Sequence, residues 1–155
     1  RDEWSNERNL RNMGITEWSI MNKPSIDHVG IATKSIEEAT VFWKALGLVT
    51  ESDHVNHEQG VRIRMLEGGA DSPKVELLEP LGPETPVGKF ISKRGEGIQQ
   101  IAFTVDDISV AILRLIETGC RMINDEPLEG VGGTLIAFVH PSSTGGVLVE
   151  LVQRN

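Results

Sequence analysis

An internal repeat constrains the fold of this chain more than any other feature of the sequence. Residues 26–33 align with residues 98–105 at an offset of 72 positions, with apolar side chains in matching places. Further along, residues 75–78 (Val-Glu-Leu-Leu) align with residues 149–152 (Val-Glu-Leu-Val) at an offset of 74. Two matches in the same order indicate that the chain contains two copies of one module.

Hydrophobic periodicity and turn residues predict the elements of each copy. Ser35 and Glu38 form a capping box for a helix over residues 35–46, and Gly47 ends that helix. The other expected elements are a helical turn at 87–93, a helix at 107–118, and strands at 26–33, 61–66, 74–78, 97–105, 121–124, 135–140 and 147–152. We therefore predict an α+β fold of two tandem βαβββ modules that form a half-open β-barrel.

The repeat also separates an N-terminal segment from one folded domain. Residues 1–23 are mostly polar and charged and lie outside both copies, so we expect an upstream or artificial extension that takes no part in the fold. The domain should cover residues 24–155, with the first module at about 26–90 and the second at about 97–153. A chain of 155 residues is long enough to bury a sizeable apolar core.

Charge and composition argue against several classes of protein. A net charge of −8 is unfavourable for general nucleic-acid binding, although a cleft can still focus potential on a small anionic ligand. No apolar run approaches the roughly 18 residues of a membrane span, and residues 1–20 lack the apolar stretch of a secretory signal. Cys120 is the only cysteine, and we expect it to be a buried packing residue. These features predict a cytoplasmic protein.

Polar residues inside otherwise apolar strands are aligned by the repeat. His28 of the first copy falls on Gln100 of the second, and Glu76 falls on Glu150. Singly, His28 could be a hydrogen-bonded strand histidine and Glu76 could face solvent. Together, related by a pseudo-two-fold axis, an imidazole, an amide oxygen and two carboxylates form a ligand set suited to Co²⁺, Mn²⁺, Ni²⁺ or Zn²⁺. We predict that these four residues bind one divalent metal ion.

The chain contains an ordered set of motifs at residues 26–32 (IDHVGIA), 75–81 (VELLEPL), 95–98 (GEGI), 124–127 (NDEP), 140–141 (HP) and 146–151 (GVLVEL). Together these motifs resemble the methylmalonyl-CoA epimerases of the vicinal oxygen chelate superfamily. Glyoxalase I and the extradiol dioxygenases belong to the same superfamily. The resemblance implies the vicinal oxygen chelate fold, a divalent ion that is often cobalt, epimerisation of methylmalonyl-CoA at C2, and a homodimer.

The resemblance also implies roles for particular residues. Many relatives have two histidines where this chain has Gln99 and Gln100, and an amide oxygen should bind the metal more weakly than an imidazole. Glu150 is implied to be both a ligand and the first base. Some relatives place a second glutamate at the position of Ile63. Glu67 is the nearest carboxylate on the same strand face by the period of two, so we predict Glu67 as the second base.

Basic side chains are candidates to bind the phosphates of CoA. They are Arg62, Arg64, Lys89, Lys93 and Arg94. The arginines at 62 and 64 form one cluster and the basic residues at 89–94 form another, and each cluster could also be a solvated face. The backbone of residues 130–133 could approach the thioester arm. Ethylmalonyl-CoA differs from methylmalonyl-CoA by one methylene and remains open as a substrate. The alternative functions are another vicinal oxygen chelate enzyme, such as a glyoxalase-type isomerase or a dioxygenase, and a metal-free binding protein.

Overall fold

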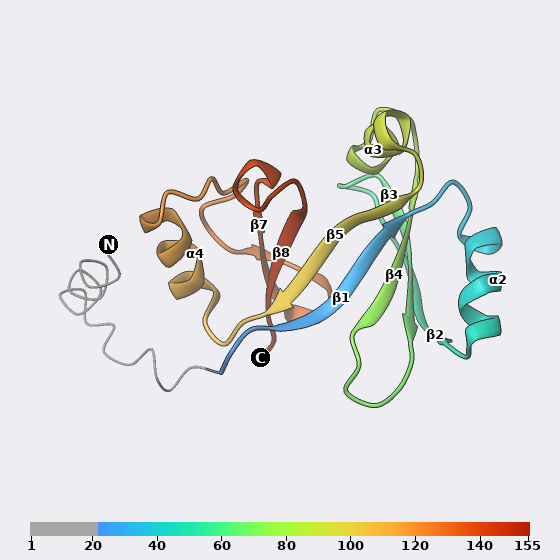
Figure 1. The fold of residues 1–155 in the computed structure, drawn as a ribbon, viewed down its shortest axis with the longest axis horizontal. Coiled ribbons are helices and arrows are strands. Elements are labelled where there is room, and N and C mark those ends of the chain that lie inside the picture. Colours follow the sequence, from blue (N-terminus) through green and yellow to red (C-terminus); the bar gives the residue numbers. More distant parts are fainter. Residues whose placement is uncertain (1–21) are drawn as a thin grey trace.

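The structure is a computed structural model that describes residues 22–155 (Figure 1). The first half contains β1 (Ser25–Ala32), α2 (Ile36–Leu46), β2 (Val49–Asn56), β3 (Val61–Glu67) and β4 (Lys74–Pro80). After α3 (Pro86–Arg94), the second half contains β5 (Gly97–Thr104), α4 (Ile108–Glu117), β6 (Leu128–Glu129), β7 (Leu135–Val139) and β8 (Leu148–Gln153). This order confirms the predicted α+β fold of two βαβββ modules. Of the expected N-terminal extension, residues 1–21 lie outside the described part of the chain.

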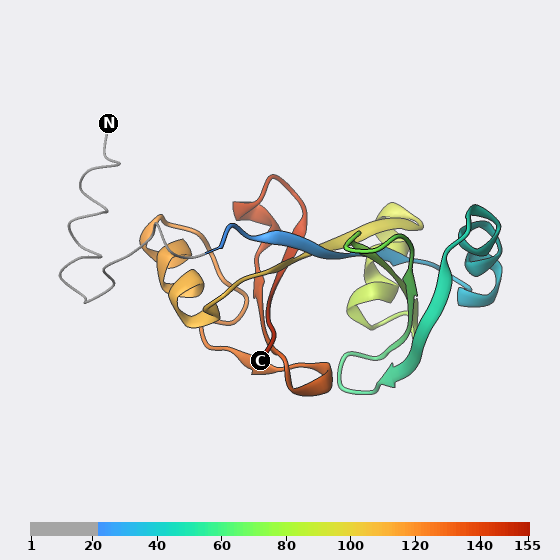
Figure 2. The ribbon, with the colours of Figure 1, turned by 90° about the horizontal axis from the view of Figure 1, so that it is seen from below.

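All these strands form one eight-stranded sheet in the order β2-β3-β4-β1-β5-β8-β7-β6. Within the halves, β1 pairs in parallel with β4, and β5 pairs in parallel with β8. The halves join where β1 and β5 pair antiparallel, and we call this ladder the seam. Figure 2 shows the sheet curled into an open half-barrel, as predicted. Because both halves have the same strand order outward from the seam, equivalent residues meet there.

Local sequence explains where the outer helices begin. The side chain of Ser35 accepts a hydrogen bond from the Glu38 N–H, and Gly47 ends α2 in the left-handed conformation with φ 114°. Asp107 caps α4 in the same way by accepting from the Val110 N–H. The helix predictions for 35–46 and 107–118 are thus confirmed to within a residue at each end. Both helices pack on the outer face of the sheet (Figure 1).

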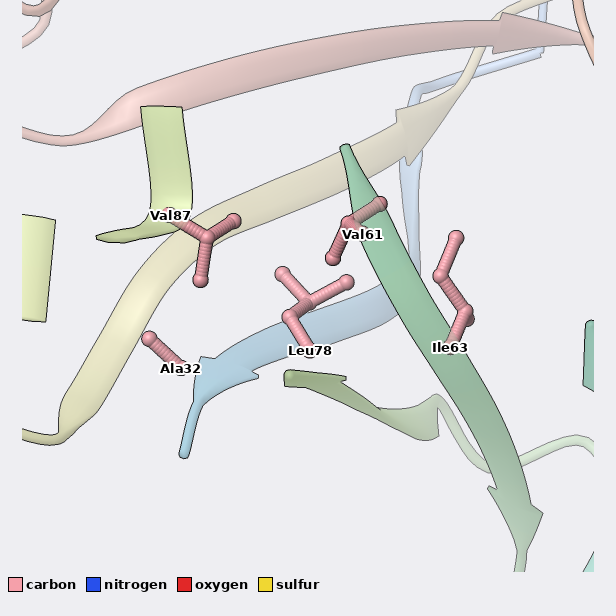
Figure 3. Packing of buried hydrophobic residues seen from close by; sticks show 5 residues of the cluster. All are labelled: Ala32, Val61, Ile63, Leu78 and Val87. Carbon is pink, nitrogen blue, oxygen red and sulfur yellow. The ribbon is translucent and has the colours of Figure 1, made fainter. Parts of the chain in front are cut away.

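Helix α3 packs on the inner face of the first half instead. Figure 3 shows Val87 of α3 beside Ala32 of β1, Leu78 of β4, and Val61 and Ile63 of β3. These five side chains are almost fully buried, with exposed fractions of 0–7%. This cluster closes one end of the half-barrel with apolar side chains and leaves the middle of the inner face free.

Two strand predictions need correction. Residues 49–56 form β2, an edge strand that was not predicted because six of its eight side chains are exposed and its sequence has no apolar alternation. The strand expected at 121–124 is only an isolated bridge between Met122 and Val139, and the two-residue β6 lies further along the chain. Within residues 22–155, no helix combines the length and the apolar character that crossing a membrane requires.

Candidate metal and active site

Four buried polar side chains meet on the inner face at the seam. They are the predicted residues His28, Glu76, Gln100 and Glu150, here called the seam residues, and each is less than a tenth exposed. The Nε2 atom of His28 lies 3.2 Å from Glu150 Oε2 and 3.6 Å from Glu76 Oε2. Gln100 Nε2 donates to Glu76 Oε1 at 3.1 Å and to Glu150 Oε2 at 3.2 Å. The structure therefore brings together all four residues that the repeat aligned.

Strand register brings about this convergence. Across the seam, Gly30 pairs with Gln100 and His28 pairs with Ala102. In the parallel ladders, Gly30 also pairs with Glu76, and Ala102 also pairs with Glu150. A Cβ atom on Gly30 would lie 2.5 Å from Cγ of Gln100, so Gln100 can lie across β1 only because residue 30 is glycine.

Each strand of the seam has a β-bulge directly before its seam residue. On β1, Asp27 is the extra residue, and its Oδ2 lies 2.7 Å from Nδ1 of His28. On β5, Gln99 is the extra residue, and it lines the same inner cavity. Asp27 and Gln99 occupy equivalent positions in the repeat. Aligning the two copies could therefore have singled out both residues, although neither residue type does so by itself.

Hydrogen bonds hold the Asp27–His28 pair in place. Arg154 donates to both carboxylate oxygens of Asp27 at 2.8 and 2.9 Å, and Thr104 Oγ1 donates to Oδ1 at 3.2 Å. The hydrogen bond from His28, together with Arg154, keeps the pKa of Asp27 well below its usual range even though burial opposes the shift. An aspartate fixed on Nδ1 orients the imidazole so that Nε2 faces the two glutamates.

Burial and charge shift the pKa values of the seam residues. Burial by itself would lower the pKa of His28, but the hydrogen bond to Asp27, the contact with Glu150 and the charge of Glu76 raise it to about 10. Burial raises the pKa of Glu76 to about 7, against the opposing charge of His28. Without an added ligand, the imidazolium is thus the cation that balances the carboxylates.

The seam residues offer donor types that a divalent metal ion needs. Nε2 of His28 is buried and makes no well-aligned hydrogen bond, although it lies 3.2 Å from Glu150 Oε2. Ligand bonds of about 2.1 Å would place neighbouring donors roughly 3 Å apart, close to the 3.2 and 3.6 Å that separate His28 Nε2 from the nearest oxygens of Glu150 and Glu76. As they stand, the side chains contact one another, and residues 22–155 contain no cluster of three or more His, Cys, Asp or Glu side chains arranged to hold a metal. The seam residues fit a metal by donor type and by the buried Nε2 of His28, which faces two carboxylates.

An open cavity of about 1140 Å³ extends from the seam residues along the inner face of both halves. In residues 22–155, the buried side-chain polar atoms without a hydrogen-bond partner are His28 Nε2, His54 Nε2 and Gln99 Oε1. All three residues line this cavity, as do Gly130 to Gly132 of the loop expected near a thioester. Because unpaired buried polar atoms are costly, their grouping indicates a place for a polar ligand. Sequence reasoning missed His54 because β2 was not predicted.

The other predicted residues lie away from this cavity. Arg62 and Arg64 alternate with the cavity-lining residues of β3, so the period of two turns them to the outer face. There Arg64 pairs with Asp53 at 2.7 Å, and both arginines pair with Glu37 of α2. The remaining predicted residues Glu67, Lys89, Lys93 and Arg94 are exposed and do not line the cavity. Cys120, expected to be buried, is half-buried in an apolar pocket under α4.

Comparison with known proteins defines the class. The Glyoxalase/Bleomycin resistance protein/Dioxygenase superfamily matches residues 27–138. The chain is 38% identical over 129 residues to the uncharacterized protein YqjC of Bacillus subtilis, covering 83% of this chain and 91% of that protein. It is 35% identical over 136 residues to the mitochondrial methylmalonyl-CoA epimerase of Bos taurus, covering 86% and 77%. A solved methylmalonyl-CoA epimerase in complex with methylmalonyl-CoA and NH4+ matches with a TM-score of 0.78 at 37% identity, covering 85% and 95%.

The protein belongs to the Glyoxalase/Bleomycin resistance protein/Dioxygenase superfamily. Within it, the chain belongs with the methylmalonyl-CoA epimerases, and it is an isomerase of the epimerase type.

Proposed function

We propose that the protein interconverts the two epimers of methylmalonyl-CoA at C2, with one divalent ion held by the seam residues. The observation that carries this proposal is the group of four buried donors at the wall of an open cavity. The similarity to an epimerase solved with methylmalonyl-CoA supports the choice of substrate. Co²⁺ is the ion we expect first, with Mn²⁺, Ni²⁺ and Zn²⁺ as alternatives that suit the same donors.

The chemistry of the substrate agrees with these residues. The C2 proton lies between a thioester and a carboxylate, so its removal gives an enolate whose charge spreads onto oxygen. A bound ion would stabilise that charge. Glu150 can remove the C2 proton because its carboxylate opens onto the cavity, and Asp27 holds His28 in the orientation that keeps Nε2 beside Glu150. Inversion also requires a proton donor on the opposite face.

Substrate binding and assembly complete the proposal. Arg62 and Arg64 are engaged with acidic side chains on the outer face, which leaves the exposed cations of α3 as the proposed contacts for the CoA phosphates. We also propose a homodimer, which light scattering of the purified protein would test. An iron dioxygenase is less well supported, because such sites use two imidazoles and only one is present among the seam residues.

Proton exchange tests the proposed reaction directly. The Co²⁺-loaded protein is incubated with one epimer of methylmalonyl-CoA in D₂O, and C2 is followed by mass spectrometry and by a stereospecific assay. We expect deuterium uptake and inversion well above those of a metal-stripped control. Absence of both in the metal-loaded protein would rule out the epimerase function.

A further inference from the structure

We propose that His54 is the second acid–base group of the epimerisation, acting on the face of the substrate opposite Glu150. This inference rests on the proposed function. His54 lies on β2 and lines the cavity, and its Nε2 is buried with no hydrogen-bond partner. An imidazole is a suitable proton carrier because it can either donate or accept a proton at a ring nitrogen.

The other cavity walls offer few groups for this role. The β3 side chains that line the cavity are Val61, Ile63 and Met65, so β3 supplies no titratable group there. The strands on the two sides of β3 contribute Glu51 of β2 and Lys74 of β4 to the lining, but these two side chains form an ion pair with each other.

The remaining acidic residues that line the cavity are either more exposed than His54 or already paired. Glu58 lies in the turn between β2 and β3, and Glu129 lies in β6 at the far edge of the sheet. Asp27 is already held by His28 and Arg154. Outside the seam residues, His54 alone among the titratable groups lining the cavity within residues 22–155 has a buried, unpaired side-chain atom.

Sheet register places His54 and Glu150 on opposite walls of the half-barrel. His54 pairs with Ile63 of β3, which in turn pairs with Leu78 of β4, two residues beyond Glu76. With strands about 4.8 Å apart and a rise of about 3.3 Å per residue, the Cα atoms of His54 and Glu76 are roughly 12 Å apart. Glu150 belongs to the other half, beyond the seam. A small acyl group between these walls would present opposite faces to the two groups.

The proton transfers balance for this pair. The Glu150 carboxylate takes the C2 proton of one epimer, and the C–H electron pair moves into the enolate. The enolate then takes a proton from Nε2 of the protonated His54 on the opposite face, which forms the new C–H bond. Glu150 ends protonated and His54 ends neutral. The other epimer reacts by the reverse sequence, and exchange with water resets the two groups.

The variant His54→Gln separates this role from the proposed function. In D₂O, the metal-loaded variant should invert methylmalonyl-CoA on the order of 100-fold more slowly than the unaltered protein, because one general acid–base group is missing. It should still incorporate deuterium at C2 of the epimer whose proton Glu150 removes, without inverting it. His57→Gln is the matched control, since His57 lies in the adjacent turn, is exposed and does not line the cavity.

Inversion by His54→Gln at the rate of the His57→Gln control would overturn the assignment of His54. So would equal loss of deuterium exchange from both epimers in a variant whose circular dichroism spectrum is unchanged. If the longer amide disturbs β2, His54→Asn gives the same test. Failure of the unaltered protein to exchange either epimer is a different result, which would contradict the proposed function itself.

Discussion

The two halves of the molecule place different chemistry at equivalent positions. In the first half, the bulge residue Asp27 binds Nδ1 of His28 and raises the pKa of the imidazole. In the second half, the bulge residue Gln99 leaves its Oε1 unpaired, and its neighbour Gln100 contributes a neutral amide. The backbone thus has the same geometry in both halves, while the side chains at equivalent positions differ in their chemistry. The first half therefore supplies an imidazole to the group of four, and the second half supplies an amide.

The outer helices show a second difference. Under α2, Trp43 and Leu48 pack against the cluster of Ile36, Leu66 and Leu77. At the equivalent positions of the second half stand Leu115 and Cys120, and an apolar cavity of about 320 Å³ lies beside them. Where α2 presents an indole to the sheet, α4 thus presents smaller side chains around an open apolar pocket.

The largest expected effect comes from the two equivalent glutamates. Glu150→Gln should lower the rate of epimerisation on the order of 10³-fold, because it removes both a proposed ligand and a base. Glu76→Gln should lower it less, by roughly 10- to 100-fold, through weaker metal binding alone. Steady-state kinetics at one subsaturating Co²⁺ concentration would compare them. Equal losses in both variants would show that Glu150 has no second role.

Restoring the symmetry of the seam should strengthen metal binding. Gln100→His replaces an amide oxygen with an imidazole, and we expect Co²⁺ affinity to rise about 10-fold in a calorimetric titration. Gln99→His is the control, because Gln99 belongs to the bulge and not to the four converging side chains. An unchanged affinity in Gln100→His would argue that residue 100 is not a ligand.

Breaking the hydrogen bond between Asp27 and His28 should change the pKa of His28 in the metal-free protein. Asp27→Asn should bring the pKa of His28 down from about 10 toward its ordinary 6.5, as followed by NMR of the imidazole. A raised folded-state pKa adds stability that is complete below pH 6.5 and lost as the pH rises through 10. The free energy of unfolding of the metal-free protein should therefore fall over this range, and less steeply in Asp27→Asn. Parallel curves would contradict this account.

The smallest expected effects concern packing under the helices. Trp43→Leu should lower the free energy of unfolding by about 2 kcal/mol, because it opens a cavity under α2. The reciprocal change Leu115→Trp should raise it by about 1 kcal/mol by filling the existing cavity. Urea denaturation of both variants measures the difference. Destabilisation by Leu115→Trp would show that the space under α4 cannot accept an indole.

Sequence reasoning succeeded where the side-chain pattern follows the structure directly. The capping residues Ser35 and Asp107 mark helices that begin where predicted, and the repeat groups the same four seam residues that the structure brings together. Strand β2 was missed because an exposed edge strand needs no apolar alternation.

The orientation of individual side chains was harder to predict. The outward direction of Arg64 follows from the period of two once Ile63 is known to face inward, but that requires the position of β3 in the sheet. The bulges at Asp27 and Gln99 depend on pairing between strands that are far apart in the sequence, so no local pattern reveals them.

The seam has a thermodynamic consequence for how the two halves stay joined. Each half contributes two of the four donors, so a metal ion bound there would act as a further crosslink between halves that the β1–β5 ladder and the Arg154–Asp27 ion pair already connect. Its binding free energy would then add to the cohesion between the halves in proportion to RT ln(1 + [L]/Kd). Chelation should therefore increase hydrogen exchange along β1 and β5 before it affects the amides under α2.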